Sequence, residues 1–562
     1  MTHHTCQTNT AHNNRSADRL FEIGSQSIAH GTSNPVSIEE QDLNEHFYIL
    51  GRSGTGKSNL LKELALADAK RGAGLCFIDP IGTTAEELVA ALSRPDGTGT
   101  MGGTGTKDGR TNANRVVSRR SDKDIIYFDA ADCDHPIGIN PLYQVAPKDR
   151  ARVVSDILQM FAGIWHKTGW GARMESIFRA ALHTLVENPH CMRPSLLSVF
   201  HLLLDEDFRQ TTKSALQNEQ VLNWWNFRFD RGDLNERTRR EWVEPVLNKI
   251  DTLSLDPVIR NIIGQPRCIL SFDQIIQRRQ ILIVNLNQNK IGLDNAAFIG
   301  MLILSSIRQS ATRYGDPSSP FTITLDEAHS FPTAELTRII NQGRHSSLFA
   351  RLAHQNLEQF DEDIAASLRN GCGSLAIFAI GSRNAEAIVD DLEHQHRDRC
   401  LDLINTLERG QCLLRLTRSG TPQPPSTYPM LVRYQPMAAW NRRARRRLVG
   451  ALSRTRERFA ITKLTAEYQI AFAHKRPTQQ DYLHWKSLFR KERRQREQEH
   501  ARLKGEGQAR KKDMAVQQVQ LNTNGEGKKG TRCSQLRSDD GLQQIADLVF
   551  GKSSGVRNKR RT

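Results

Sequence analysis

The sequence predicts an α/β protein with a mostly parallel central sheet, an inserted all-helical domain and a basic, partly disordered C-terminal tail. Short apolar runs alternate with helical patterns, which is typical of parallel strands joined by crossover helices. Between Pro147 and Pro266 strand signals almost vanish, and apolar residues such as Val154, Ile157 and Phe161 recur at helical spacing. The third observation is charge, because the basic excess is confined to the last quarter of the chain.

The expected elements divide the 562 residues into five regions. A polar N-terminal extension (1–43) precedes the first part of the α/β domain (44–146). The all-helical insert (147–270) separates it from the second part (271–437), and the basic helical and disordered tail covers 438–562. The expected strands are the apolar runs Phe47–Leu50, Leu75–Ile78, Ile125–Phe128, Ile281–Leu286, Phe321–Leu325, Leu348–Ala353, Leu375–Ile380 and Cys412–Leu416. Residues 97–109, rich in Gly and Thr, predict a flexible surface loop.

Composition excludes several classes of protein. With 38% hydrophobic and 25% charged residues, the chain is neither collagen-like nor wholly disordered. Its longest apolar stretch, near Ala296–Leu304, is far shorter than the ~18 residues of a membrane span, and the polar N-terminus lacks a secretory signal pattern. Nine cysteines without a Cys-x-x-Cys pair indicate reduced thiols. We therefore expect a cytoplasmic protein without an intrinsic membrane span.

The charge distribution suggests a polyanionic partner. The net charge is +16, from 78 Lys and Arg against 62 Asp and Glu. From Met437 onward the chain has 31 basic and 12 acidic residues, a net charge of +19. The rest of the chain has 47 basic and 50 acidic residues, a net charge of −3. A near-neutral body with a basic tail favours contact with DNA or RNA, and an anionic membrane surface is the weaker alternative. A solvated helix with a disordered tail would also explain the charges.

Residues 51–58, GRSGTGKS, match the phosphate-binding pattern G-x-x-x-x-G-K-[ST] between an apolar run and a helical pattern. Glycines let the backbone wrap around phosphate oxygens, and the following helix N-terminus favours negative charge. Lys57 is expected to neutralise the β- and γ-phosphates of ATP, and Ser58 to offer its hydroxyl to Mg²⁺. The alternative is a plain glycine-rich turn. The candidate nucleotide contacts are Gly51, Arg52, Ser53, Gly54, Thr55, Gly56, Lys57, Ser58 and Asn59.

Two carboxylates, Asp326 and Glu327, directly follow the apolar run Phe321–Leu325. This is the Walker B arrangement, in which Asp326 holds the Mg²⁺ shell and Glu327 orients or activates the attacking water. An Asp-Glu pair at a helix N-terminus is common in other contexts. Together with the P-loop, however, the pair indicates a hydrolysing site.

Arg344 and Gln355 flank the expected strand Leu348–Ala353. The amide of Gln355 could contact the γ-phosphate and sense its presence. Arg344 could reach a phosphate across a subunit boundary as an arginine finger, although Arg369 and Arg383 are alternatives. A surface ion pair for Arg344 and a plain loop position for Gln355 would be the simpler explanation.

These stretches resemble the HerA–FtsK superfamily of P-loop motors. The chain is most similar to the soluble ATPase part of TraG/TraD-like coupling proteins of conjugative type IV secretion. The resemblance spans roughly residues 44–430 and is carried by HFYILGRSGTGKSNLL, LCFIDPIG, IIYFDAADCDHPIGINPLY, ILIVNLNQNKIGLDNAAFIG, ITLDEAHSF and RHSSLFARLAHQNLEQF. One departure is Thr83, which stands where the family usually has an acid.

The resemblance implies a RecA-like fold, a homo-hexameric ring with DNA in its channel, and the finger and sensor roles of Arg344 and Gln355. It implies an ATP-hydrolysing DNA translocase, with a secretion channel or relaxosome proteins as possible partners that recruit it to the inner face of the membrane. The alternatives are a HerA-like helicase or translocase in DNA processing, an assembly ATPase that moves protein, and a non-hydrolysing scaffold.

Three further groups of residues have simpler interpretations. A metal site could be formed by His394, His396 and Cys400, but their charged neighbours favour an exposed helix. Trp165, Trp170, Trp224 and Trp225 could stack on bases, but in an all-helical segment they are more often core. Leu542–Val549 could be a partner-docking peptide or a helix packed on its own domain.

Overall fold

The computed structural model describes most of the chain up to residue 498. The described ranges are 20–27, 33–93, 122–165, 169–187, 194–231, 235–331, 333–360, 362–392, 397–417, 427–432, 442–474, 478–495 and 497–498. A first compact unit ends at Tyr482, and a second begins at Leu483. In the second unit, residues 483–495 are helical. The Gly/Thr-rich loop, His394, His396 and the stretch 542–549 lie outside the described residues.

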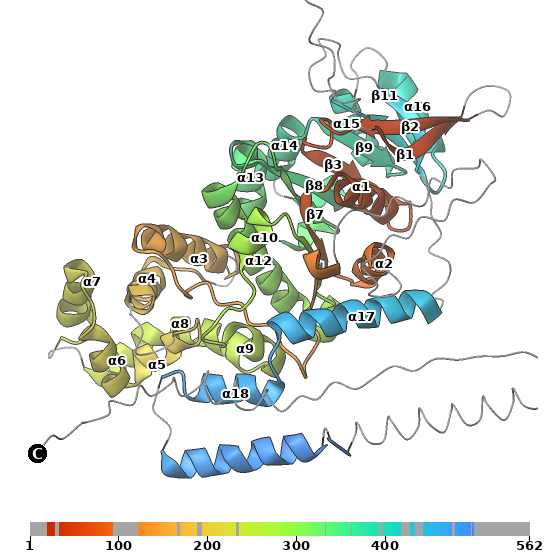
Figure 1. Ribbon diagram of the computed structural model, residues 1–562. Helices are drawn as coiled ribbons and strands as arrows, with labels where there is room; N and C mark the ends of the chain where they lie inside the picture. Colours follow the sequence, from red (N-terminus) through yellow and green to blue (C-terminus); the bar gives the residue numbers. More distant parts are fainter. Residues whose placement is uncertain are drawn as a thin grey trace, which may run out of the picture. The chain divides into compact units, whose positions relative to one another are not determined.

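One 11-stranded sheet forms the centre of the first unit (Figure 1). Its strands lie in the order β2 (Ser33–Glu39), β1 (Leu20–Ser27), β11 (Thr427–Val432), β10 (Gln411–Arg415), β9 (Ser374–Phe378), β3 (Phe47–Leu50), β8 (Leu348–His354), β7 (Phe321–Leu325), β4 (Gly74–Asp79), β6 (Ile281–Asn285) and β5 (Ile125–Asp129). From β9 to β5 all neighbours are parallel. The strands β10, β11, β1 and β2 extend this sheet antiparallel. The expected mostly parallel sheet is thus confirmed.

The central strands are apolar on both faces, as parallel strands covered by helices must be. In β3, Tyr48 and Leu50 join one buried cluster while Phe47 and Ile49 join the other. One cluster contains α1 (Lys57–Arg71) and α2 (Thr83–Leu92), and the other contains α12 (Leu293–Tyr314), α13 (Thr333–Gln342) and α14 (Glu362–Gly371). The remaining helices of this domain are α11 (Gln288–Ile291), α15 (Ser382–Leu392) and α16 (Arg397–Thr406).

Between β5 and β6 every described element is helical. These elements are α3 (Arg150–Trp165), α4 (Ala172–Glu187), α5 (Ser198–Leu204), α6 (Glu206–Lys213), α7 (Glu219–Trp224), α8 (Glu236–Ser254), α9 (Pro257–Ile263), α10 (Phe272–Gln277) and a π-helical turn at Trp225–Phe229. Trp225 is fully buried, and its indole N–H donates to Thr184 Oγ1 at 2.7 Å. Trp225 therefore lies in the core of this segment, and the partly buried Trp165, Trp170 and Trp224 pack against that core.

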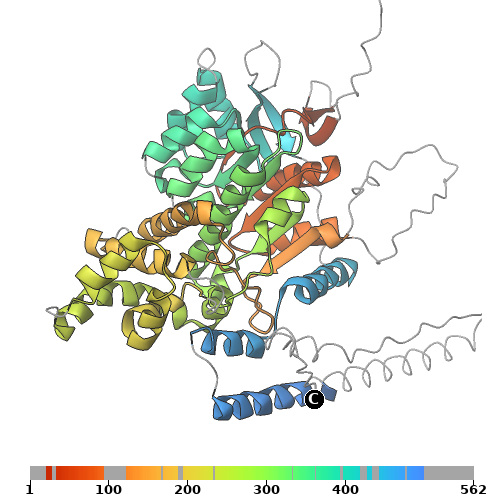
Figure 2. The same cartoon turned by 60° about the vertical axis from the view of Figure 1, so that its left-hand side comes forward.

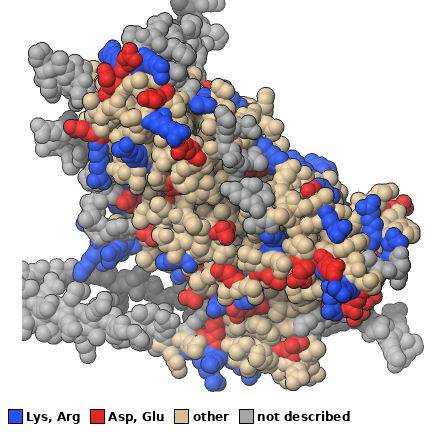
Figure 3. Space-filling view, turned by 180° about the vertical axis from the view of Figure 1, so that it is seen from behind, with Lys and Arg blue, Asp and Glu red and all other residues tan. Residues whose placement is uncertain are grey.

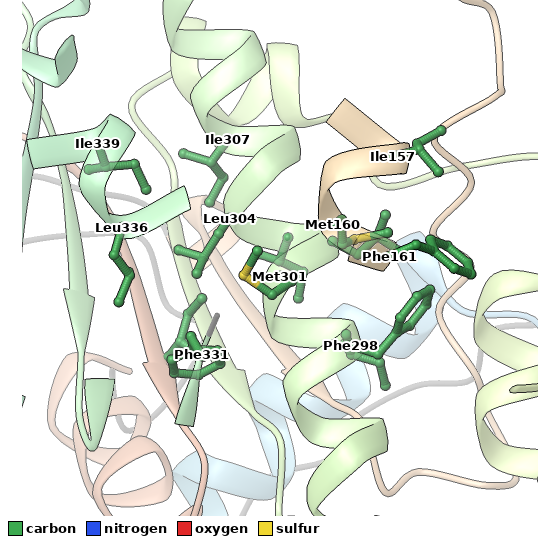
Figure 4. Packing of buried hydrophobic residues seen from close by; sticks show 14 of the residues in the cluster. Ile157, Met160, Phe161, Phe298, Met301, Leu304, Ile307, Phe331, Leu336 and Ile339 are labelled. Atoms are coloured by element: carbon green, nitrogen blue, oxygen red, sulfur yellow. The ribbon is translucent and has the colours of Figure 1, made fainter. Parts of the chain in front are cut away.

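Helix α12 joins the helical segment to the sheet domain. Its Met301 and Leu304 face Phe331, which precedes α13, and Leu336 of α13, whereas its Phe298 packs against Phe161 of α3 (Figure 4). The Phe161 and Phe298 rings meet edge to face with centroids 5.6 Å apart. A single apolar core thus runs from the helical segment to the strand that carries Asp326.

The N-terminal extension and the start of the tail are more ordered than the sequence suggested. Residues 20–39 were expected in a polar extension, but β1 and β2 pair there as a hairpin that joins β11. Their strand pattern is weak because only one face of this hairpin contributes buried apolar residues.

Helices α17 (Arg442–Phe459) and α18 (Lys463–Ala471), expected in a separate tail, belong to the first unit. Helix α17 packs on α2 and β5, where Thr455 Oγ1 accepts from the Tyr127 N–H at 3.0 Å (Figure 2). Arg456 pairs with Asp132 at 2.6 Å, so its charge holds the helix in place.

The face of the body opposite to that seen in Figure 1 has no single sign of charge. Lys and Arg side chains are interspersed with Asp and Glu over the face turned away from the viewer in Figure 1 (Figure 3). Within the described ranges, no helix has the length and apolar character needed to span a bilayer.

Candidate active site

The predicted site residues converge at one edge of the sheet because β3, β8 and β7 are adjacent and parallel. The P-loop follows β3, Gln355 follows β8, and Asp326 and Glu327 follow β7. Carboxyl ends of parallel strands share an edge, and ligands of open α/β sheets bind there. This strand order, with β8 between the P-loop strand and the carboxylate strand, is that of a RecA-like P-loop fold.

The P-loop is held by main-chain hydrogen bonds to its neighbours. Gly51 N–H donates to His354 O at 3.3 Å, and Arg52 N–H donates to Ala379 O at 3.0 Å. Gly54 and Gly56 adopt left-handed φ angles of 76° and 123°, which glycine tolerates best. Nothing lies within 4 Å of the position of a Cβ on Gly54, so the arch is open.

Lys57 begins α1 and is buried beneath the loop. Its Nζ donates to the carbonyl oxygens of Gly51 at 2.7 Å and Arg52 at 3.1 Å. Burial lowers the pKa of Lys57, and the nearby carboxylates of Glu327 and Asp326 counteract this. The first turn of α1 has no acidic residue and no side-chain cap, so its N–H groups remain able to bind an anion.

Ser58 and Asp326 meet across 268 residues of sequence. Ser58 Oγ donates to Asp326 Oδ2 at 2.7 Å. Burial raises the pKa of Asp326 to about 6, with smaller contributions from Asp79 and Glu327, while the Ser58 hydrogen bond lowers it. A hydroxyl beside a carboxylate at a phosphate-binding loop fits Mg²⁺, which takes oxygen ligands and is commonly bound together with substrate phosphates.

Glu327 is held in a specific orientation by Gln355 and His329. Gln355 Nε2 donates to Glu327 Oε1 at 2.8 Å, and His329 Nδ1 lies 3.4 Å from Oε2. Glu327 has a left-handed φ of 47°, which is unusual for a residue other than glycine and common at functional sites. Burial lowers the pKa of His329 despite the attraction of Glu327. Gln355, predicted as the sensor, thus contacts the carboxylate predicted to orient water.

A cavity of about 730 Å³ lies in front of these groups. Among the predicted residues it is lined by Ser53, Gly54, Gly56, Lys57, Ser58, Asn59, Asp326 and Glu327. Ile81, Thr83 and Thr84, around the start of α2, also line it. Five more lining residues were not predicted from the sequence, namely Glu22, Gly24, Ser25, Arg409 and Gly410. They come from β1 and from the turn before β10, and no local motif marks them, because only the antiparallel strand order brings them here.

The structure places Arg344 elsewhere. It precedes β8 at the opposite end of the strand from Gln355, and seven residues at ~3.3 Å each separate the two ends by roughly 20 Å. Its side chain is about half exposed and pairs with Glu45 at 2.5 Å. Arg344 therefore cannot reach the P-loop of its own chain.

Asp79 and Thr83 lie on either side of the turn that leads from β4 into α2. The Asp79 carboxylate accepts from Ile81 N–H and Ala85 N–H, each at 2.9 Å, so it shapes the turn into α2. Thr83, the first residue of α2, lines the cavity described above.

Comparisons with known proteins give only distant matches. No protein-family model and no curated protein matches the chain. Among solved structures, the chain is similar to the unbound bacterial conjugative coupling protein TrwB, with 15% identity and a TM-score of 0.49 over 74% of this chain and 91% of that one. TrwB in complex with ADP and Mg²⁺ is 15% identical, with a TM-score of 0.48 over 75% of this chain and 96% of that one. VirB4 of Thermoanaerobacter pseudethanolicus is 12% identical, with a TM-score of 0.42 over 75% of this chain and 98% of that one.

Proposed function

We propose that this protein is an ATPase that binds MgATP at the carboxyl edge of β3, β8 and β7 and hydrolyses it. The observation that carries the proposal is the pair of long-range hydrogen bonds Ser58–Asp326 and Gln355–Glu327, which join three strands into one site. Lys57 and the P-loop amides would bind phosphates, and Ser58 and Asp326 would hold Mg²⁺. The bound ion would neutralise charge developing on the phosphates.

Glu327 would orient and deprotonate the attacking water. One oxygen of its carboxylate accepts from Gln355, and the second lies 3.4 Å from His329 Nδ1. Because Glu327 lines the cavity, its carboxylate can accept a proton from a water held there. Gln355 would at the same time contact the γ-phosphate, so loss of that phosphate would change its contact with Glu327.

We infer that the chain works as a ring in which Arg344 completes the site of a neighbour. The support is geometric, because Arg344 is exposed on the edge opposite its own P-loop. A homo-hexamer, as the resemblance implies, would place such an edge against the nucleotide site of the next subunit.

We propose DNA as the polymer on which the motor acts. The support is the charge of the C-terminal quarter, part of which is now assigned to α17. Its first turn contains no acidic residue, and Arg442, Arg443, Arg445 and Arg446 are exposed. No ion pair neutralises these four side chains within the described part of the chain. Such a cluster favours phosphate backbones. Transfer of DNA in a conjugative type IV secretion-like system is the specific role that the sequence resemblance favours.

The decisive experiment measures ATP hydrolysis without DNA and with single- or double-stranded DNA. The variants are Lys57→Ala and a truncation after residue 498, which removes no described element. DNA-stimulated hydrolysis that Lys57→Ala abolishes would support the motor, and loss of stimulation on truncation would assign the tail as a tether. Hydrolysis that ignores DNA would instead favour an ATPase that moves protein.

A further inference from the structure

The turn before β10 reaches the P-loop because β10 reverses the direction of the sheet. Strand β9 is parallel to β3, and β10 pairs antiparallel with β9. The N-terminal end of β10 therefore lies at the edge from which the P-loop emerges. Gly410 N–H donates to Thr55 O at 2.8 Å, which ties the turn to the loop.

The turn Glu408–Gln411 is internally braced. Gln411 N–H donates to Glu408 O at 3.0 Å, and the Gln411 side-chain oxygen accepts from Glu408 N–H at 3.0 Å. Gly410, the third residue, has a φ of 88°, which the corresponding position of a type II turn requires. A Cβ on Gly56 would stand 3.3 Å from Gly410 Cα, so turn and loop are closely packed. The backbone of Arg409 is thus fixed beside the phosphate-binding arch.

Arg409 lines the same cavity as Lys57 and Ser58. It is exposed, and no hydrogen bond or ion pair joins its guanidinium to another described residue. Arg409 is the only arginine among the described residues that line this cavity. A guanidinium fixed beside a phosphate-binding loop and without a carboxylate partner is suited to bidentate binding of phosphate oxygens.

We propose that Arg409 binds the phosphate chain of the nucleotide held by its own P-loop. This inference rests on the proposed ATPase function and adds a second cation, besides Lys57, that belongs to the same subunit. Arg409 and Arg344 then have separate roles: Arg409 binds nucleotide within one chain, and Arg344 acts across a boundary. The cost of removing Arg409 should therefore appear in nucleotide affinity, whether or not a ring forms.

The test uses isothermal titration calorimetry to measure the affinity of the full chain for MgADP, MgGDP and a non-hydrolysable MgATP analogue. Arg409→Gln should weaken all three by about 10- to 100-fold, as expected for a lost charged hydrogen bond. Arg409→Lys should recover part of the affinity. Arg237→Gln is the matched control, because Arg237 is 91% exposed on α8 and pairs only with Glu241 among the described residues. Melting temperatures without nucleotide should be equal in all variants.

The outcomes separate this inference from the ATPase proposal. If the wild-type chain binds nucleotide and Arg409→Gln binds it equally well, the inference is wrong and the ATPase proposal stands. A loss confined to the adenine nucleotides would place Arg409 on the base and would also overturn the phosphate assignment. A wild-type chain that binds none of the three ligands would overturn both proposals.

Discussion

Gln355 and Glu327 lie at the ends of neighbouring strands, and the amide of Gln355 donates to the carboxylate of Glu327 at 2.8 Å. The sequence assigned these residues separate roles, one sensing the γ-phosphate and the other positioning water. Their contact links the two roles, because a change in the hydrogen bonds of Gln355 must alter the orientation of Glu327.

Glu327→Gln should abolish hydrolysis while preserving nucleotide binding. The amide oxygen can still accept from Gln355, but it cannot take a proton from water, so we expect a loss of about 10²- to 10⁴-fold in kcat. Phosphate release and MgADP affinity measure the two effects. Glu241→Gln, on an exposed face of α8, is the control and should hydrolyse normally. Retained activity in Glu327→Gln would exclude this residue as the base.

Gln355→Ala should reduce the discrimination between tri- and diphosphate. The variant loses the side chain that can contact the γ-phosphate, so the affinity for a non-hydrolysable MgATP analogue should fall about 10-fold relative to that for MgADP. The kcat should also decrease because Glu327 loses its orienting hydrogen bond. An equal decrease in both affinities would argue against a sensor role.

Arg344→Ala and Lys57→Ala should each be inactive alone and partly active when mixed. In a mixed ring, an intact P-loop of one variant can meet an intact Arg344 of the other, because these residues lie at opposite edges of a subunit. The measurement is ATP hydrolysis at varying ratios of the two variants. Absence of any recovery, with ring formation verified by light scattering, would rule out action in trans.

Stability should decrease as the pH falls from about 6.5 towards 4, partly because of His46. Burial, with a smaller contribution from Arg344, lowers the pKa of His46 to about 4, and its Nδ1 accepts from Ala350 N–H at 2.9 Å. The unfolded chain binds this proton at higher pH, so the folded state loses up to about 3 kcal/mol across that window.

In His46→Asn the side-chain oxygen can accept the same hydrogen bond without titrating. The difference between the urea unfolding free energies of wild type and this variant should therefore shrink or reverse as the pH is lowered. His354, whose pKa is lowered to about 3 by burial, is present in both chains and cancels from the comparison. Parallel pH curves would contradict the assignment.

Truncation before α17 should destabilise the first unit, whereas truncation after residue 498 should not. Loss of α17 leaves the buried Tyr127 N–H without Thr455 Oγ1 and uncovers apolar surface of α2, which together should cost about 2 kcal/mol or more. Thermal melts of both truncations and the full chain measure this effect. Equal melting temperatures for all three would show that α17 is dispensable for the fold.

The sequence by itself determined the α/β class, the P-loop and the paired carboxylates, because each depends on a short segment. The P-loop pattern needs only a strand, the loop 51–56 and a helix N-terminus, and Asp326 and Glu327 directly follow their own apolar strand. The break in strand pattern between Pro147 and Pro266 likewise reflects local periodicity.

Only the tertiary structure decided which distant segments complete the site. The order of the strands places β8 between β3 and β7, so Gln355 reaches Glu327 while Arg344 lies at the far edge. The antiparallel pairing of β10 with β9 and of β1 with β11 brings Arg409 and Ser25 to the cavity, and packing on α2 and β5 places α17 in the first unit rather than in the expected tail. These relationships depend on long-range pairing and packing, which local sequence patterns do not encode.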